Sequence, residues 1–110
     1  MIIFLGGLLK RAQSFLRPRY HYTKVEELPD ELYKYQVYIL GEGRYSWSIA
    51  LLCPCGCGDT IQLNVRADEH PFWSYSTIGR QITISPSIWR KIGCRSHFIL
   101  KKSRVFWCSN

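Results

Sequence analysis

The residues with the clearest chemical potential are cysteines, three of which crowd into one short stretch. Cys53, Cys55 and Cys57 alternate with a proline and a glycine, and Cys94 lies much further along the chain. Proline and glycine allow such a loop to fold back and aim several sulfur atoms at one point. Converging thiolates in a tetrahedron are the ligands that Zn²⁺ prefers. We therefore predict that these four cysteines hold one structural zinc ion.

The cysteine count also indicates the redox environment. The chain has 5 cysteines, an odd number, and cysteines separated by one residue rarely satisfy disulfide geometry. The pattern favours a reducing cytoplasm with metal-bound thiolates, and it leaves Cys108 as a free thiol. The alternative is that two of the clustered cysteines are simply small buried apolar residues.

A serine and a histidine form the second candidate site. His97 follows Ser96 directly, and adjacent residues of a strand point to opposite faces, so His97 would need a serine from another segment. Ser87, just after a proline, is the first candidate and Ser74 the second. A histidine within reach of a serine hydroxyl can activate it as a nucleophile, with an acid to orient the ring. Two aspartates could supply that acid, and the sequence does not choose between Asp59 and Asp68.

Each member of this pair also has a structural interpretation. Ser87 after Pro86 is typical of a turn or cap residue. His97 could be a core histidine or, at Cys-x-x-His spacing from Cys94, a zinc ligand. The catalytic interpretation requires the two side chains to meet, so their separation tests it. A site of four thiolates would be closed, with no open position for a catalytic water.

Size and charge set wider limits. The chain has 110 residues, which predicts one domain, and its formal net charge is +7. Six basic residues and several aromatics lie between positions 89 and 107 without an acid. Such a segment could bind nucleic acid through phosphate contacts and stacking, or an acidic partner, or it could be a solvated basic face.

Alternating hydrophobicity predicts a mainly β fold, a small antiparallel sheet or barrel stapled by a zinc knuckle. Residues 20–34 are expected to be a polar connector, and Pro86 is expected to break a strand. The predicted knuckle lies between the second and third strands. About seven strands are expected, at 35–40, 45–52, 59–65, 72–76, 81–84, 94–100 and 105–107.

The N-terminal segment is predicted to be separate from the zinc-stapled β domain over 20–110. Apolar residues recur at helical spacing through residues 1–19, with basic residues between them and Pro18 at the end. The pattern predicts an amphipathic helix that packs on the domain or on a partner. The alternative is contact of residues 1–17 with a membrane surface, because the apolar run is too short to span a bilayer.

Several motifs together resemble a small bacterial zinc-binding family of unknown function, over roughly residues 28–107. The shared features include Trp73-Ser74 and the sequence CRSHF over 94–98. The family usually continues its Pro-Ser-Ile motif with Gly-Asn, where this chain has Trp89-Arg90. The remaining matches are CPCGCG at 53–58, Pro86-Ser87-Ile88, and Val105 and Trp107 near the end.

The resemblance implies a role beside ubiquitin-like conjugation enzymes. Family members occur next to genes for E1-like, E2-like and ubiquitin-like proteins, often in antiphage islands. They are expected to process or remove the ubiquitin-like modifier, as a serine-type peptidase or hydrolase with Ser87 and His97 as the reactive pair. The same resemblance assigns the metal site to Cys53, Cys55, Cys57 and Cys94. The alternative function is a non-enzymatic, zinc-stabilised adaptor that binds a protein partner or nucleic acid.

Overall fold

Short stretches of alternating burial build the strands, and these strands form two sheets. In β4 (Thr60–Asn64), for example, Ile61 and Leu63 point inward and Thr60 and Gln62 outward. The computed structural model describes residues 18–109, and in this range it contains eight strands. Besides β4, they are β1 (His21–Val25), β2 (Gln36–Glu42), β3 (Tyr45–Leu52), β5 (Ser74–Ile78), β6 (Gln81–Trp89), β7 (His97–Lys101) and β8 (Arg104–Trp107).

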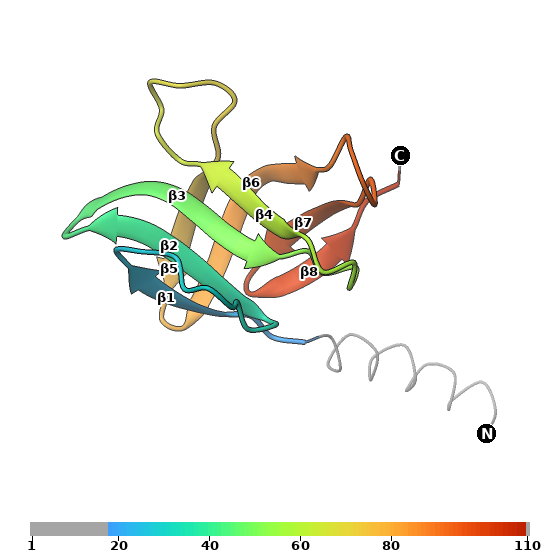
Figure 1. The fold of residues 1–110 in the computed structure, drawn as a ribbon, viewed down its shortest axis with the longest axis horizontal. Helices are drawn as coiled ribbons and strands as arrows, with labels where there is room; N and C mark the ends of the chain where they lie inside the picture. The colour runs from blue at the N-terminus through green and yellow to red at the C-terminus, as the bar shows by residue number, and fades with distance from the viewer. Residues whose placement is uncertain (1–17, 110) are drawn as a thin grey trace.

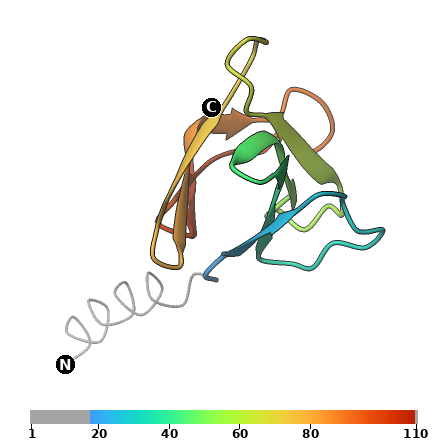
Figure 2. The same cartoon turned by 90° about the vertical axis from the view of Figure 1, so that its left-hand side faces the viewer.

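Each sheet contains four strands that are consecutive in the chain. The first has the order β1-β2-β3-β4 and the second β5-β6-β7-β8. Strands β1 and β2 are parallel, and all other neighbours are antiparallel. Figures 1 and 2 show the sheets as two layers. The prediction of a mainly β fold is confirmed, and the single sheet or barrel is corrected to two sheets.

The differences from the predicted strands have local causes. Strand β1 lies inside the stretch predicted to be a polar connector. Its sequence HYTKV is mostly polar, as suits a strand at the edge of a sheet, and therefore lacks the alternating hydrophobicity from which a strand is predicted. Strand β7 starts at His97 instead of Cys94, because Cys94 belongs to a turn and Arg95 after it has a positive φ of 56°, which is not a strand conformation. Pro86 does not end β6. The β5 pairing stops at Ser85, and the β6–β7 register shifts between Ile84 and Ile88, so Pro86 interrupts no ladder there.

The N-terminal prediction lies almost wholly outside the described residues. Residues 1–17 of the expected helix are not described, and the next two residues belong to no helix or strand. Within residues 18–109, the structure contains no helix long and apolar enough to cross a membrane.

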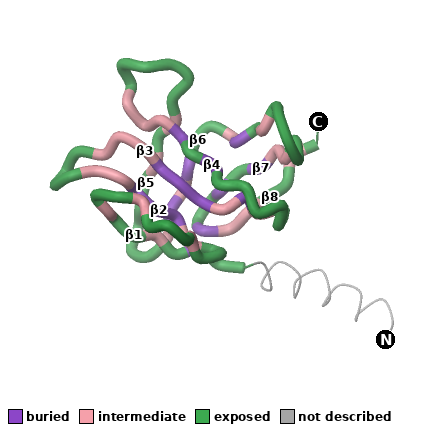
Figure 3. Tube along the Cα trace, viewed as in Figure 1, coloured by how far each residue is buried: buried purple, intermediate pink, exposed green. Residues whose placement is uncertain are grey.

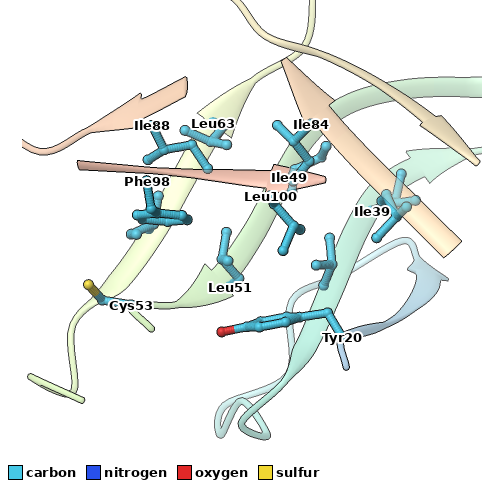
Figure 4. Close-up of a cluster of buried hydrophobic side chains, with 13 residues drawn as sticks. Tyr20, Ile39, Ile49, Leu51, Cys53, Leu63, Ile84, Ile88, Phe98 and Leu100 are labelled. Carbon is cyan, nitrogen blue, oxygen red and sulfur yellow. The ribbon is translucent and has the colours of Figure 1, made fainter. Parts of the chain in front are cut away.

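The core lies between the sheets and reaches the cysteine loop. Buried segments run along the middle of the strands, whereas the connecting loops are exposed (Figure 3). Phe98 and Leu100 of β7 meet Ile49 and Leu51 of β3, with Cys53 at the border of the same cluster (Figure 4). Burial of apolar side chains contributes roughly 25 cal/mol per Å², so this cluster is the main source of stability. The first cysteine of the loop is therefore fixed by the core itself.

A buried serine ties the β7–β8 turn to β6. Lys102 and Ser103 both have positive φ, 49° and 65°, in a turn position where glycine or asparagine is usual. Ser103 is fully buried, its Oγ accepts a hydrogen bond from the Ile82 N–H at 2.9 Å, and its own N–H donates to the Ile82 carbonyl at 2.8 Å. Its carbonyl accepts from the Tyr20 N–H at 2.7 Å. These bonds offset the cost of the turn.

Ser103→Ala is expected to lower the free energy of unfolding by about 1–3 kcal/mol, because it leaves the buried Ile82 N–H without an acceptor. Urea denaturation of the wild-type and variant proteins measures this loss. Ser76→Ala, which removes an exposed hydroxyl from β5, should change stability by less than about 0.5 kcal/mol. Equal midpoints for the two variants would contradict the assignment.

Candidate functional site

Four sulfur atoms converge at one end of the sandwich. The loop between β3 and β4 supplies Cys53, Cys55 and Cys57, and the loop between β6 and β7 supplies Cys94. All four sulfurs lie within 4.8 Å of one another, and Cys53 Sγ is 3.4 Å from Cys55 Sγ and 3.6 Å from Cys94 Sγ. Tetrahedral zinc with Zn–S bonds of about 2.3 Å would separate its sulfurs by about 3.8 Å. The spacing therefore fits a metal ion held by four thiolates.

The backbone of the loop explains how it makes this turn. Gly56 and Gly58 have φ of 89° and 87°, a region that other residues rarely adopt. The Gly56 N–H donates to the Cys53 carbonyl at 3.2 Å, and the Cys53 N–H donates to the Asp59 carbonyl at 2.8 Å. The first bond closes a tight turn and the second continues the β3–β4 ladder. The loop is thus shaped by its own hydrogen bonds.

The surroundings of the four cysteine thiols give them different pKa values. Hydrogen bonding from the Ser96 hydroxyl, 3.1 Å away, lowers the pKa of Cys94 to about 6, and the Ser96 amide adds to the effect. Ser96 also lowers the pKa of Cys55. Burial raises the pKa of Cys53 to about 11. Ser96 therefore stabilises thiolate at Cys94 and Cys55, whereas Cys53 and Cys57, whose pKa is also raised, retain their protons until a metal displaces them.

Arg90 connects the sulfur cluster to the end of β6. Its Nη1 donates to Cys94 Sγ at 3.0 Å and to Cys57 Sγ at 3.4 Å, while its Nη2 donates to Asp59 Oδ2 at 3.0 Å. The hydrogen bond to Asp59 raises the pKa of Arg90. The Arg90 backbone N–H also donates to the Ser96 carbonyl at 2.8 Å. One residue thus joins the cysteine cluster to the start of β7.

Ser87 and His97 meet beside this junction. Ser87 Oγ lies 2.9 Å from His97 Nε2, and both residues are half-buried. Ser87 comes from the irregular part of β6, where the pairing with β7 skips from Ile84 to Ile88. The Trp73 indole N–H donates to the Ser87 carbonyl at 3.3 Å. The geometry suits proton transfer from the serine hydroxyl to the imidazole.

His97 has an unusual set of neighbours. Its Nδ1 is buried and has no hydrogen-bond partner among the described residues. Its ring stacks on the Trp89 indole, with ring centroids 4.7 Å apart and planes 10° apart. Lys91 Nζ lies 3.0 Å from the centroid of the same indole. The imidazole is therefore held by a hydrogen bond on one nitrogen and by an aromatic surface on its face.

The other predicted residues are placed differently. Ser74 faces Ser85 across the β5–β6 ladder and has no hydrogen bond to His97. The candidate acids are both bound to arginines, Asp59 to Arg90 at 3.0 Å and Asp68 to Arg66 at 2.9 Å. The possible metal site consists of cysteines alone, so the structure does not place His97 in it. Cys108 lies outside the cluster and is half-buried.

Sequence reasoning missed three residues of this region. Trp73, Trp89 and Arg90 were noted only as shared or divergent motif positions, or as part of a basic aromatic segment. The structure shows the Arg90 guanidinium on the thiols and the Lys91 ammonium over an indole, so part of that basic segment is engaged with the site. The sequence signal for these contacts was the group of aromatic and basic residues that follows Ser87. The spacing of these residues does not show which of them contact the site.

Comparison with known proteins gives one match. Residues 24–108 match the model of a family described as bacterial ubiquitination-like system serine protease (BubE). No curated protein and no solved structure matches the chain. The matched range contains all four clustered cysteines and both members of the Ser87–His97 pair.

Proposed function

The chain belongs to the bacterial ubiquitination-like system serine protease (BubE) family, and from this premise we propose that it cleaves acyl bonds at the C-terminus of a ubiquitin-like modifier. Ser87 is the nucleophile and His97 the general base. The observation that carries this proposal is the 2.9 Å contact between Ser87 Oγ and His97 Nε2. Two groups able to exchange a proton meet in a domain whose family is described as a serine protease family.

The proposed reaction is acyl transfer in two stages. Ser87 Oγ attacks the carbonyl carbon of the modifier's last residue, and its proton passes to His97 Nε2. The tetrahedral intermediate collapses as the bond to the leaving group breaks, and the imidazolium returns the proton to that group. Water then attacks the Ser87 ester by the same route, with His97 taking a proton from the water and returning it to Oγ. The products are the free modifier and the unchanged enzyme.

The oxyanion of the intermediate needs a backbone donor close to Ser87. The β6–β7 pairing omits residues 85–87, so the Ser87 N–H lies outside that ladder. We assign the oxyanion to this N–H, since a donor from the nucleophile's own residue is fixed relative to Oγ. A preorganised donor of this kind contributes roughly 10²–10³-fold to the rate.

The metal in this proposal is zinc, and its role is structural. Four thiolates are a zinc site of the closed type, which leaves no position for substrate or water. When bound, the ion would connect the two cysteine loops through metal–thiolate bonds. The cysteines, together with Ser96 and Arg90, thereby fix the ends of β6 and β7 from which Ser87 and His97 project.

The expected partners are the modifier and the E1-like and E2-like enzymes that conjugate it. The family description places the chain in a ubiquitination-like system, which supports partners of this class. A reducing cytoplasm is the proposed location, because all 5 cysteines are unpaired and four of them are needed as thiolates.

A serine-directed fluorophosphonate tests the assignment. We expect the probe to form one covalent adduct, located on Ser87 by peptide mass spectrometry. His97→Ala should reduce the labelling rate by roughly 10²-fold or more, because the hydroxyl loses its base. Ser85→Ala, a neighbouring exposed serine, should label like the wild type. An adduct on another serine, or equal labelling without His97, would refute the proposed pair, and the adaptor function would then be favoured.

A further inference from the structure

The reactive pair lacks the group that usually orients a catalytic histidine. In a Ser–His–Asp triad, a carboxylate accepts a hydrogen bond from Nδ1 and so holds the ring and its tautomer. Here Nδ1 of His97 is buried without a partner among the described residues, and the candidate acids Asp59 and Asp68 are each bound to an arginine. When Ser87 Oγ donates to Nε2, the proton of the neutral ring must be on Nδ1, where no residue among 18–109 accepts it. Something else must therefore keep the imidazole aligned.

The indole of Trp89 is the group in position to do this. Trp89 and His97 are direct partners in the β6–β7 register, so their side chains leave the sheet on the same face. The rings are nearly parallel, at 10°, with centroids 4.7 Å apart. Trp89 is 47% exposed, so its indole also forms part of the surface around the pair. A flat surface against one face of the imidazole restricts rotation about its Cβ–Cγ bond.

We propose that Trp89 is a positioning residue that aligns the His97 imidazole by stacking, in place of an orienting carboxylate. This inference rests on the proposed function of Ser87 and His97. The stack keeps Nε2 directed at Ser87 Oγ, as the 2.9 Å contact requires. It also lies against the charge that develops during the reaction, because the imidazolium is a cation and the face of an indole attracts cations.

Lys91 supports the indole in this role. Its ammonium lies 3.0 Å from the centroid of the Trp89 ring, which is a cation–π contact. Trp89 is at the end of β6 and Lys91 is in the loop that follows, so the contact restrains the tryptophan where the strand ends. The site is thus arranged as lysine on indole and indole on imidazole.

The test compares Trp89→Ala with Trp89→Phe in the zinc-loaded protein. Both the kcat for cleavage of a modifier fusion and the rate of fluorophosphonate labelling of Ser87 are measured. Trp89→Ala is expected to lower both by about threefold to tenfold, the range expected for loss of one aromatic stack. Trp89→Phe keeps a stacking ring and should stay within about twofold of the wild type. Lys91→Met should fall between them.

The labelling rate separates positioning from other roles. A small phosphonate makes few contacts outside the serine, so loss of a substrate-binding surface would raise KM without slowing labelling. Ile92→Ala removes a neighbouring apolar side chain that is 84% exposed, and it should leave both rates unchanged. Unchanged kcat and labelling in Trp89→Ala would overturn the inference while leaving Ser87 as nucleophile. If Ser87→Ala itself still cleaves, the proposed function fails instead.

Discussion

Ser87→Ala is expected to reduce cleavage of a modifier fusion by about 10⁴-fold or more. The variant removes the only atom that forms the acyl bond, so any remaining hydrolysis depends on water activated by His97. Because Ser87 is half-buried and lies outside the hydrophobic core cluster, loss of its hydroxyl leaves no core cavity. The measurement is kcat/KM for a ubiquitin-like modifier joined through its C-terminus to a reporter protein, alongside a thermal melt to show that folding persists.

The matched control lies two residues away in the same irregular part of β6. Ser85→Ala also removes an exposed serine hydroxyl next to Pro86 and should cleave at the wild-type rate. His97→Ala should lose nearly as much activity as Ser87→Ala, and the double variant should lose little more, because the two side chains act as one unit. Activity in Ser87→Ala within tenfold of the wild type would remove Ser87 from the reaction.

Removal of the metal is expected to lower Tm by at least about 10 °C and to abolish cleavage. Structural zinc in small peptides contributes on the order of 10–16 kcal/mol, which is comparable to the stability of a whole domain. A loss of even about 2 kcal/mol would shift Tm by about 8–16 °C at this size. Activity should fall with stability, because Arg90 and Ser96 link the cysteines to the strand ends that carry Ser87 and His97.

Low pH should also promote loss of the metal, and with it loss of stability and activity. Burial holds the pKa of Cys53 at about 11, so metal binding at neutral pH must displace its proton. The pKa of Cys57 is also raised above its usual value, so its proton must be displaced as well. The pKa of Cys94 is about 6, so below that pH a further proton competes with the metal. Affinity for the metal therefore falls as pH falls, and more steeply below pH 6. Zinc release to a chromophoric chelator, followed across this range, measures the trend.

Cysteine substitutions give the controls for metal removal. Cys53→Ser should prevent stoichiometric zinc binding and reproduce the effect of the chelator. Cys108→Ser should bind zinc and cleave normally, because its sulfur lies outside the cluster. Its backbone N–H, which donates to the His97 carbonyl at 2.9 Å, is retained by the substitution. Wild-type stability and cleavage in a protein shown to be free of metal would contradict the structural role.

The sequence allowed prediction of features that depend on residue type and local spacing. Alternating apolar residues located most strands, and the Cys-x-Cys-x-Cys loop indicated four cysteines that the structure does bring together. Prediction failed where pairing overrides local preference. Strand β1 is a polar edge strand defined by its partner β2, and Pro86 is accommodated because the register skips it.

In the candidate site too, residue types could be predicted from the sequence, whereas the contacts between strands could not. Ser87 and His97 could be nominated from residue type and from the resemblance, but their 2.9 Å contact depends on a register between two strands. The stack of Trp89 on His97 is also a cross-strand contact, and no periodicity in the sequence encodes it. Asp59 and Asp68 were reasonable orienting acids by type, yet each is bound to an arginine. Long-range pairing, which single-sequence patterns do not report, accounts for these differences.

The consecutive strand order in each sheet has a consequence for folding. Every ladder, including that of the parallel pair β1 and β2, joins strands that follow one another directly in the chain, so each half can assemble from contacts that are close in the sequence. Cys94 comes from the second half and its three partner thiols from the first. A metal ion held by all four thiolates therefore requires both halves to be in place.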